Sequence, residues 1–368
     1  MNKLCLVYNF APKYREGIFR LIDKEYSCDW YFGKNNTDIK GLDLSILNSV
    51  RQLSDWRIPH TPFYYQCGVP SLLWRKEYQV FFMLGELYSL STWWFLILRK
   101  LFFPKKKVYF WTHGWYGKET PIRKVLKKVF FKAVDGIFLY GNYAKRLMIE
   151  EGFDEKKLFV IHNSLNYEKQ MGIRKQLQAS DIYKAHFNDE LPTLIFIGRL
   201  TKVKRLDLLL DALEALKEKN ILFNLTLVGD GEEKEHLKAK VKELGLEKQV
   251  WFYGACYDEK KNAELIFNAD LCVSPGNVGL TAMHTMMFGC PVITHNNFPY
   301  QMPEFEAIHE GTTGDFFEYD NVGAIANCIE SWFAKHRDNR EAVRLACYHE
   351  IDTQWNPLFQ MEVIKKYL

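Results

Sequence analysis

The 368-residue chain lacks several patterns that would assign it to a protein class at once. Its eight cysteines are scattered, with no C-x-x-C pair and no Cys/His spacing typical of a metal site. Most lie in apolar stretches, where cysteine behaves as a small hydrophobic residue. These absences argue against a disulfide-stapled secreted protein and against a zinc module. They favour a chain kept reduced in the cytoplasm.

Very long apolar runs are also missing. The longest, LYSLSTWWFLILRKLFF at 87–103, is interrupted by two basic residues and falls short of a membrane-spanning helix. It predicts either a helix packed on the core or an interfacial helix on a membrane, because Trp93, Trp94 and the Lys105–Lys107 cluster are typical interfacial anchors. The opening MNKLCLVYNF has no small-residue cleavage site and predicts a strand instead of a signal peptide.

No charge of one sign dominates, since the formal net charge is only +4. The charge is nevertheless uneven: residues 1–165 carry 26 Lys and Arg against 15 Asp and Glu, and the remainder carries 23 against 30. The basic half predicts contact with an anionic membrane or an anionic acceptor. No nucleic-acid-binding motif occurs, so nucleic acid is not an expected partner.

Apolar strand-like runs alternate with amphipathic helix-like runs along most of the chain. This alternation indicates βαβ units and mostly parallel sheets. A first series spans residues 4–165 and a second begins at 193. Residues 166–190 are polar with no strong strand signal, and we expect the linker there. The chain is long enough for two domains, each with its own core.

The loop GRLTKVK at 198–204 follows a predicted strand in the second half. Ligands of parallel sheets bind where strands end and helices begin. Gly198 permits close backbone approach, and the cations Arg199 and Lys204 suit a diphosphate. Taken alone, both cations are equally consistent with solvated surface charges.

Two further loops follow strands in the same half. VGDG at 228–231 is a strand-to-helix turn of a common kind. GNVGLTAMH at 276–284 opens a helix at Gly279, whose unpaired backbone N–H groups suit an anion. His284 sits one turn into that helix, and a partly buried structural histidine is the alternative interpretation.

Together these loops resemble the retaining family-4, or group 1, glycosyltransferases of the GT-B fold. The resemblance is good over about residues 190–320 and looser before them, and it is carried by GRLTKVK (198–204), VGDG (228–231), VWFYG (250–254), GNVGLTAMH (276–284) and GCPVI (289–293). It implies an α/β protein of two Rossmann-like domains facing across a cleft, at 1–170 and 185–345. A C-terminal helix at about 350–368 would cross back to the first domain.

The resemblance implies that Arg199 and Lys204 stabilise the leaving diphosphate. The implied donor-binding residues are Gly198, Gly229, Gly254, Asn277, Gly279, Leu280, Thr281, His284 and Glu304. The family usually has two glutamates spaced E-x7-E in the third loop, and here Gly276 and His284 occupy those positions. Glu304 and Glu306 downstream are candidates for the missing carboxylate, with surface charge as the alternative.

The N-terminal half supplies further candidates. FWTHGWYG at 110–117 places His113 after an apolar strand, where several family members carry a catalytic-side histidine facing the donor sugar. A packing histidine is the alternative. The early loop NFAPKYREG also follows a strand, and its Lys13 and Arg15 are expected to line an acceptor pocket, where Arg15 suits a phosphate or carboxylate.

The implied activity is transfer of a sugar from a nucleotide diphosphate sugar to a glycan or lipid-linked acceptor, with retention, in surface polysaccharide or glycoconjugate biosynthesis. No cofactor or metal is expected, because the two cations would replace it and no D-x-D pair stands out. Two other classes stay open: a non-catalytic nucleotide-sugar-binding partner subunit and a GT-B-fold sugar-nucleotide epimerase. We expect the chain in the cytoplasm, at the inner face of a membrane.

Overall fold

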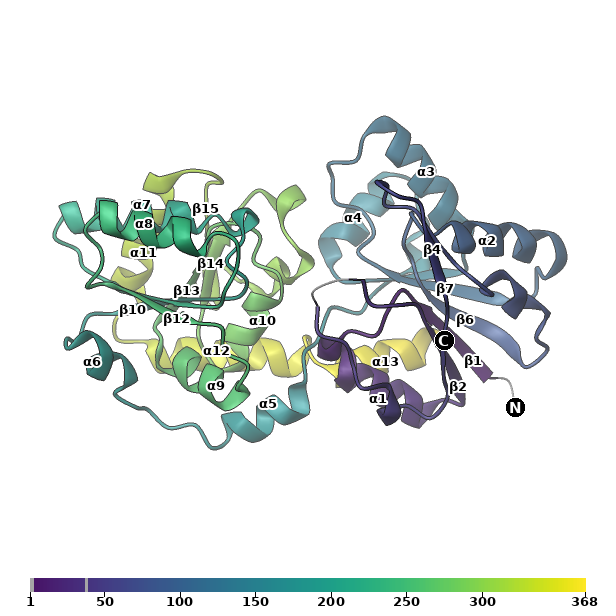
Figure 1. Cartoon of the computed structure of the whole chain (residues 1–368), viewed down its shortest axis with the longest axis horizontal. Coiled ribbons are helices and arrows are strands. Elements are labelled where there is room, and N and C mark those ends of the chain that lie inside the picture. Colours follow the sequence, from purple (N-terminus) through teal and green to yellow (C-terminus); the bar gives the residue numbers. More distant parts are fainter. Residues whose placement is uncertain (1–2, 37–38) are drawn as a thin grey trace. The chain divides into compact units, whose positions relative to one another are not determined.

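The computed structural model describes residues 3–36 and 39–368 and divides the chain into two units (Figure 1). Unit 1 comprises Met1–Asn166 and Asn356–Leu368, and unit 2 comprises Tyr167–Trp355. The sequence of unit 2 is therefore inserted into that of unit 1. Each unit is built on its own parallel sheet, so the predicted fold of two Rossmann-like α/β domains is confirmed.

The sheet of unit 1 has seven strands in the order β3-β2-β1-β6-β7-β8-β9, and all its neighbouring strands are parallel. The order changes direction between β1 and β6. Its strands are β1 (Lys3–Tyr8), β2 (Cys28–Phe32), β3 (Val50–Gln52), β6 (Tyr78–Leu84), β7 (Lys107–Thr112), β8 (Gly136–Leu139) and β9 (Leu158–Val160). An antiparallel pair lies apart from it, formed by β4 (Asp55–Arg57) and β5 (Tyr64–Gln66).

Helices cover both faces of this sheet. One core cluster joins α1 (Glu16–Glu25) and α13 (Pro357–Tyr367) to the sheet, and the other joins α2 (Leu90–Phe102), α3 (Pro121–Lys132) and α4 (Asn142–Glu150) to it. Buried Gln360 of α13 accepts from the Ser164 hydroxyl at 2.6 Å and donates to the His162 carbonyl at 2.9 Å. The last helix is thus part of unit 1.

The sheet of unit 2 has six parallel strands in the order β12-β11-β10-β13-β14-β15, and its order changes direction between β10 and β13. These strands are nearly continuous apolar runs because both faces are buried. They are β10 (Thr193–Ile197), β11 (Asn224–Val228), β12 (Val250–Gly254), β13 (Leu271–Ser274), β14 (Val292–His295) and β15 (Gly314–Phe317).

The helices of unit 2 begin inside the segment that was expected to be the linker. They are α5 (Tyr167–Arg174), α6 (Ile182–Phe187), α7 (Leu206–Glu218), α8 (Lys234–Glu243), α9 (Glu259–Asn268), α10 (Leu280–Met287), α11 (Val322–His336) and α12 (Arg340–Thr353). Residues 166–190, expected as the linker, therefore hold α5 and α6. Tyr183 of α6 is buried, and its hydroxyl donates to the Leu265 carbonyl of α9 at 2.7 Å. This segment belongs to unit 2 because it packs there.

In the segment 87–103, the helix α2 packs one face on the core and leaves the other exposed. In α2, Phe95 and Leu96 enter the core, whereas Trp94 and Leu101 are exposed. The adjoining lysine cluster is only partly at the surface, because Lys106 is buried and donates to the carbonyls of Arg75 and Tyr78, both at 2.7 Å. Among the described residues, no helix is long and apolar enough to cross a membrane.

Candidate functional site

The expected donor loops of unit 2 meet at one edge of its sheet. Gly198 follows β10 and Gly276 follows β13, the two neighbouring strands at which the sheet order changes direction. In open parallel sheets, such a point is where a crevice forms beyond the strand ends. Backbone hydrogen bonds join the loops: Gly198 N–H donates to Val228, Gly229 N–H to Gly254, and Gly276 N–H to Lys204, each at 2.9 Å.

Glycine at 229 is required by close backbone packing. A Cβ on Gly229 would lie 1.8 Å from the Gly198 carbonyl oxygen, so no side chain fits. Gly229 also has a φ of 152°. Gly254 at the end of β12 has open space around the position of a Cβ, and its carbonyl oxygen accepts from Gly229. These two predicted donor residues therefore shape the edge through their backbones.

Lys204 is the most distinctive side chain at this edge. Its Nζ donates to the backbone carbonyl of Asn277 at 2.6 Å and to the Asn277 side-chain oxygen at 2.9 Å. Burial lowers the pKa of Lys204 to about 8, the Glu304 carboxylate opposes that shift, and the charge of Arg199 adds to it. A partly desolvated lysine beside a second cation suits an incoming anion.

Glu304 and Arg199 flank this lysine. Glu304 belongs to the short 3-10 helix Pro303–Ala307, is 2% exposed and interacts electrostatically with Lys204. Arg199 directly follows Gly198 and is exposed. The structure thus brings together five predicted residues from three loops, namely Gly198, Arg199, Lys204, Asn277 and Glu304.

Gly276 has a structural reason to replace the glutamate that the resembled family carries there. A Cβ at this position would lie 2.0 Å from the Val203 carbonyl oxygen and 2.7 Å from the Lys204 Cα. The backbone of the third loop therefore packs directly on the Lys204 loop, where no side chain can enter. A glutamate at this position would require that loop to shift.

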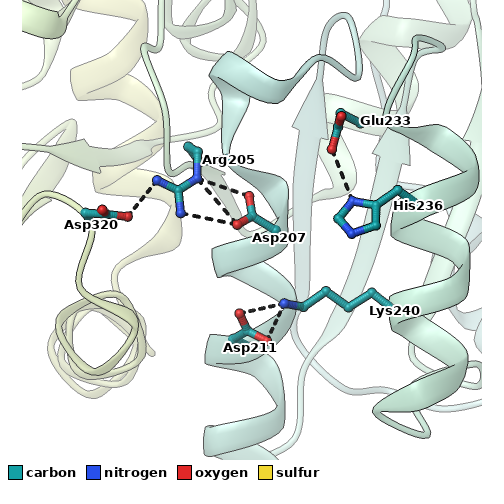
Figure 2. Close-up of polar contacts among 7 residues, drawn as sticks. All are labelled: Arg205, Asp207, Asp211, Glu233, His236, Lys240 and Asp320. Atoms are coloured by element: carbon teal, nitrogen blue, oxygen red, sulfur yellow. Dashed lines mark hydrogen bonds and ion pairs between the residues drawn. The ribbon is translucent and has the colours of Figure 1, made fainter.

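Separate ion pairs follow the Lys204 loop (Figure 2). Arg205 has a φ of 49°, a left-handed conformation that is unfavourable for a non-glycine residue. Its guanidinium pairs with Asp207 at 3.2 Å and with Asp320, beyond β15, at 2.6 Å. These contacts offset the backbone strain and hold the loop between η5 (Lys202–Lys204) and α7. Nearby, Lys240 of α8 pairs with Asp211 of α7 at 2.6 Å.

The start of α10 is tied to β10. Gly279 is the N-cap residue, Leu280 is the first helical residue, and the Thr281 hydroxyl donates to the Ile197 carbonyl at 2.9 Å. Sequence reasoning missed Gln301, which is buried and accepts from Val278 N–H at 2.9 Å. A lone glutamine carries no motif, so no sequence signal marks it.

His284 is held by a different element. Its Nε2 lies 3.1 Å from the Glu259 carboxylate of α9, which also accepts from the Gln170 amide of α5 at 2.8 Å. Burial opposes the charge of Glu259, yet the hydrogen bonds from His284 and Gln170 hold its pKa below the usual value. His284 is therefore engaged within unit 2 by a carboxylate of α9, outside the predicted site.

Of the three site residues predicted in unit 1, two line a pocket and the third does not. His113 and Arg15 both line a pocket of about 480 Å³, whereas Lys13 is not among its lining residues. The Lys13 ammonium pairs with Glu16 at 2.5 Å. Burial, and then the charges of Arg15 and Lys127, lower the pKa of His113 to about 4. At neutral pH His113 is consequently an uncharged imidazole.

Solved structures define the class of fold. The apo form of the lipopolysaccharide outer core galactosyltransferase WaaB aligns with a TM-score of 0.72 at 15% identity, covering 100% of both chains. The Anabaena protein HepE in complex with UDP aligns with a TM-score of 0.71 at 14% identity, covering 100% of this chain and 99% of that one. Likenesses at this identity establish the fold, which is GT-B.

Sequence comparisons narrow the class. Residues 178–346 match the family model described as Glycosyl transferases group 1, which supports a group 1 glycosyltransferase. The chain is 22% identical over 211 residues to an uncharacterized 41.2 kDa protein in the cps region of Klebsiella pneumoniae, covering 56% of this chain. It is 31% identical over 166 residues to mannosylfructose-phosphate synthase of Agrobacterium fabrum, covering 42% of this chain. The matches span 54% and 33% of those relatives' own lengths.

Proposed function

We propose that this chain transfers a sugar from a nucleotide diphosphate sugar to an acceptor. The observation that carries the proposal is Lys204, a lysine whose burial lowers its pKa, held by Asn277 beside Arg199 at the strand edge of a GT-B domain. The match of residues 178–346 to a glycosyltransferase family and the UDP complex of a protein with this fold support it.

In this proposal Lys204 and Arg199 stabilise the diphosphate as it leaves the sugar. Negative charge grows on the leaving oxygen in the transition state, and cations already in place stabilise it without reorganisation. A bound diphosphate also compensates the desolvation of the Lys204 ammonium. We propose that these cations serve in place of a metal ion and that no other cofactor takes part.

We further propose retention of configuration without an enzyme nucleophile. The tight packing of Gly276 leaves no side chain at the family's first carboxylate position. Buried Glu304 is our candidate to balance positive charge near the reacting centre, because it already interacts with Lys204. NMR of the product's anomeric proton tests the stereochemistry, and mass spectrometry of a trapped glycosyl–enzyme adduct would contradict the absence of a nucleophile.

The decisive experiment measures turnover of nucleotide sugars by purified protein, with and without acceptor. Lys204→Met removes the proposed cation, and Lys202→Met is its matched control because Lys202 is exposed two residues earlier. We expect Lys204→Met to lower kcat by about 10²-fold or more and the control to be unaffected. Equal loss in both variants would remove the diphosphate assignment.

The same experiment separates two other classes. Donor binding without turnover under any condition would identify a non-catalytic nucleotide-sugar-binding subunit. Conversion of the donor into its epimer in the absence of acceptor, detected by NMR, would identify an epimerase. The similarity to a protein encoded in a cps region favours an acceptor in surface polysaccharide biosynthesis, either a glycan or a lipid-linked one.

We also propose that unit 1 rests on an anionic membrane through the outer faces of α2 and α3. These helices are neighbours, since the rings of Trp93 and Phe130 lie 4.8 Å apart. Along α3, Ile122 (75% exposed) and Val125 (62% exposed) belong to an apolar stripe at helical spacing. The complete exposed apolar set on the two helices is Trp94, Ile97, Leu101, Phe102, Ile122, Val125, Leu126 and Val129.

Charge complements this apolar face. Exposed basic side chains border it, including Lys100, Lys105 and Arg123, and the first 165 residues carry an excess of cations. Apolar residues that enter the interface and cations that bind lipid phosphates act together in peripheral attachment. Through this surface the protein would bind the cytoplasmic side of the membrane that carries a lipid-linked acceptor.

A further inference from the structure

The pocket of unit 1 lies at a place in the fold that suits a ligand. It opens where β1, β6, β7 and β8 end, and the sheet order changes direction between β1 and β6. Such a point leaves a crevice beyond the carboxyl ends of the strands. With a volume of about 480 Å³, the pocket is large enough for a sugar-sized molecule.

Arg15 brings an uncompensated charge to this pocket. The residue is 6% exposed, and its guanidinium lies among the rings of Tyr8, Trp111 and Tyr140, with Trp111 nearest at 4.6 Å. Its Nε and Nη1 form no hydrogen bond to any described residue. The adjacent Glu16 carboxylate pairs with Lys13 and Arg20 instead. A buried cation without a counter-ion is costly, so this arrangement calls for an anion.

Three other polar atoms of the pocket lining are also buried without a hydrogen-bond partner among the described residues. The hydroxyl oxygens of Tyr8 and Tyr140 and Nδ1 of His113 are buried and have no hydrogen-bond partner among residues 3–36 and 39–368. Buried polar groups are almost always paired in folded proteins. Four unpaired side chains that line one pocket therefore indicate a ligand with several acceptor oxygens.

The other charged groups of the pocket leave Arg15 uncompensated. Lys127 pairs with Glu119 at 2.7 Å and donates to the Gly114 carbonyl at 2.8 Å. Glu86 accepts from the Tyr64 hydroxyl at 2.7 Å, and burial raises the pKa of its carboxyl group. Glu86, which lies just after β6, is thus paired with Tyr64 and does not neutralise the Arg15 guanidinium.

We propose that Arg15, Tyr8, Tyr140 and His113 form a subsite for a phosphate or carboxylate group on the acceptor. This rests on the proposed function, and it makes the acceptor a negatively charged molecule. The Arg15 guanidinium would donate to the anion, and the hydroxyls and the neutral imidazole would donate to its other oxygens. Lys13, which pairs with Glu16, takes no part.

The test measures binding to the purified full-length chain by thermal shift and calorimetry. The anionic probes are inorganic phosphate, glucose 6-phosphate and glucuronate, and glucose is the neutral control. UDP, GDP and ADP are tested for the donor side, and the one that binds is used with the variants. Arg15→Gln removes the cation from the pocket. The matched control is Arg20→Gln in the adjoining helix α1, because Arg20 is exposed and pairs with Glu16. Tyr140→Phe removes a single hydroxyl and keeps the proposal testable if Arg15→Gln does not fold.

We expect at least one anion, but not glucose, to bind the wild type and Arg20→Gln. Binding should weaken about tenfold or more in Arg15→Gln and several-fold in Tyr140→Phe, while binding of the nucleotide stays unchanged. Absence of anion binding to the wild type, or full binding by Arg15→Gln, overturns the subsite. Loss of nucleotide binding in Arg15→Gln would assign the anion to the donor's diphosphate and overturn the acceptor assignment. Failure of UDP, GDP and ADP alike to bind the wild type would contradict the proposed function and leave an Arg15-dependent subsite standing.

Discussion

At the residue scale, Lys204 predicts a pH dependence. Burial lowers its folded-state pKa to about 8, so the ammonium is charged at pH 7 and loses its proton as the pH rises through that value. We therefore expect kcat/KM for the donor to fall above about pH 8, since this ratio reports the ionisation of free enzyme. In Lys204→Arg, whose guanidinium stays charged, the residual activity should no longer fall there. An unchanged alkaline limb in that variant would assign the limb to another group.

The same lysine predicts a cost in stability. Because its folded pKa lies below the unfolded value, the charged form is disfavoured in the fold at neutral pH, by up to about 3 kcal/mol. The cost is present below about pH 8 and disappears as the pH rises towards the unfolded pKa. We expect Lys204→Met to unfold at the same or a higher temperature at pH 7, measured by calorimetry. A clearly lower Tm would show that the bonds to Asn277 outweigh desolvation.

Gly276 predicts that restoring the family's glutamate does not restore a site. In Gly276→Glu the new Cβ would overlap the Val203 carbonyl, so the Lys204 loop must shift. We expect a loss of about 3 kcal/mol or more in urea unfolding, together with loss of donor binding. The control is Gly172→Glu in α5, where nothing lies within 4 Å of the new Cβ and the change should be stabilising by up to about 1 kcal/mol. Similar effects of the two substitutions would contradict the packing argument.

At the element scale, the outer face of α3 predicts lipid binding. Replacing Ile122, Val125 and Val129 by serine removes exposed apolar area without touching the core. We expect binding to anionic vesicles to weaken about tenfold or more and the Tm to be unchanged. Wild-type binding should also fall at high salt.

The control for this face is Leu345→Ser in α12, an equally exposed apolar residue of unit 2. It should leave vesicle binding unchanged. Wild-type protein that does not sediment with anionic vesicles would remove the membrane proposal. Equal losses in both variants would show that the effect is not specific to α3.

Continuous apolar runs such as β10 could be predicted because a parallel strand buries both faces. The strand β2 could not, because Asp29 interrupts its apolar pattern. The fold stabilises that carboxylate through the Lys3 ammonium at 3.1 Å and the Tyr78 hydroxyl at 2.6 Å. Both residues lie far from Asp29 in the sequence. Likewise α5 and α6 were missed because their few apolar residues give no clear helical period.

The candidate site also has parts that the sequence could predict and parts that it could not. The loop that holds Arg199 and Lys204 could be predicted because glycine-bounded turns after apolar strands are local patterns. That Arg15 lines a pocket could be predicted from the loop after β1. The rest of the lining could not, because Tyr8, Glu86 and Tyr140 become neighbours only through the order of the strands. Gly276 was visible as a departure from the family, but its cause is a backbone contact that no sequence pattern reports.

At the scale of the whole molecule, the inserted position of unit 2 predicts how fragments behave. Residues 167–355 form a continuous unit with its own sheet, and we expect this fragment to unfold cooperatively by circular dichroism. Residues 1–166 lack α13, whose Met361 and Ile364 are part of the core against α1. That fragment should bind a hydrophobic dye and lose cooperative unfolding, and equal stability with the intact chain would contradict this.

A single substitution tests the same dependence within the intact chain. In Gln360→Leu the Ser164 hydroxyl and the His162 carbonyl lose their buried partner, at a cost of about 1–3 kcal/mol. Glu362→Gln, on the exposed side of the same helix, is the control and should change stability little. Urea unfolding of both variants measures the difference.

The return of α13 to unit 1 also sets an order of biosynthesis. Translation produces all of unit 2 between the last strand of unit 1 and the helix that completes it. Unit 2 can thus fold as it leaves the ribosome, whereas α1 keeps an uncovered apolar surface until α13 is made. Folded unit 2 then acts as a compact spacer, because Asp352 near its end accepts from the Tyr167 hydroxyl at its start at 2.9 Å. This shortens the loop that α13 must close. The nascent chain is accordingly most vulnerable to aggregation through the half that is made first.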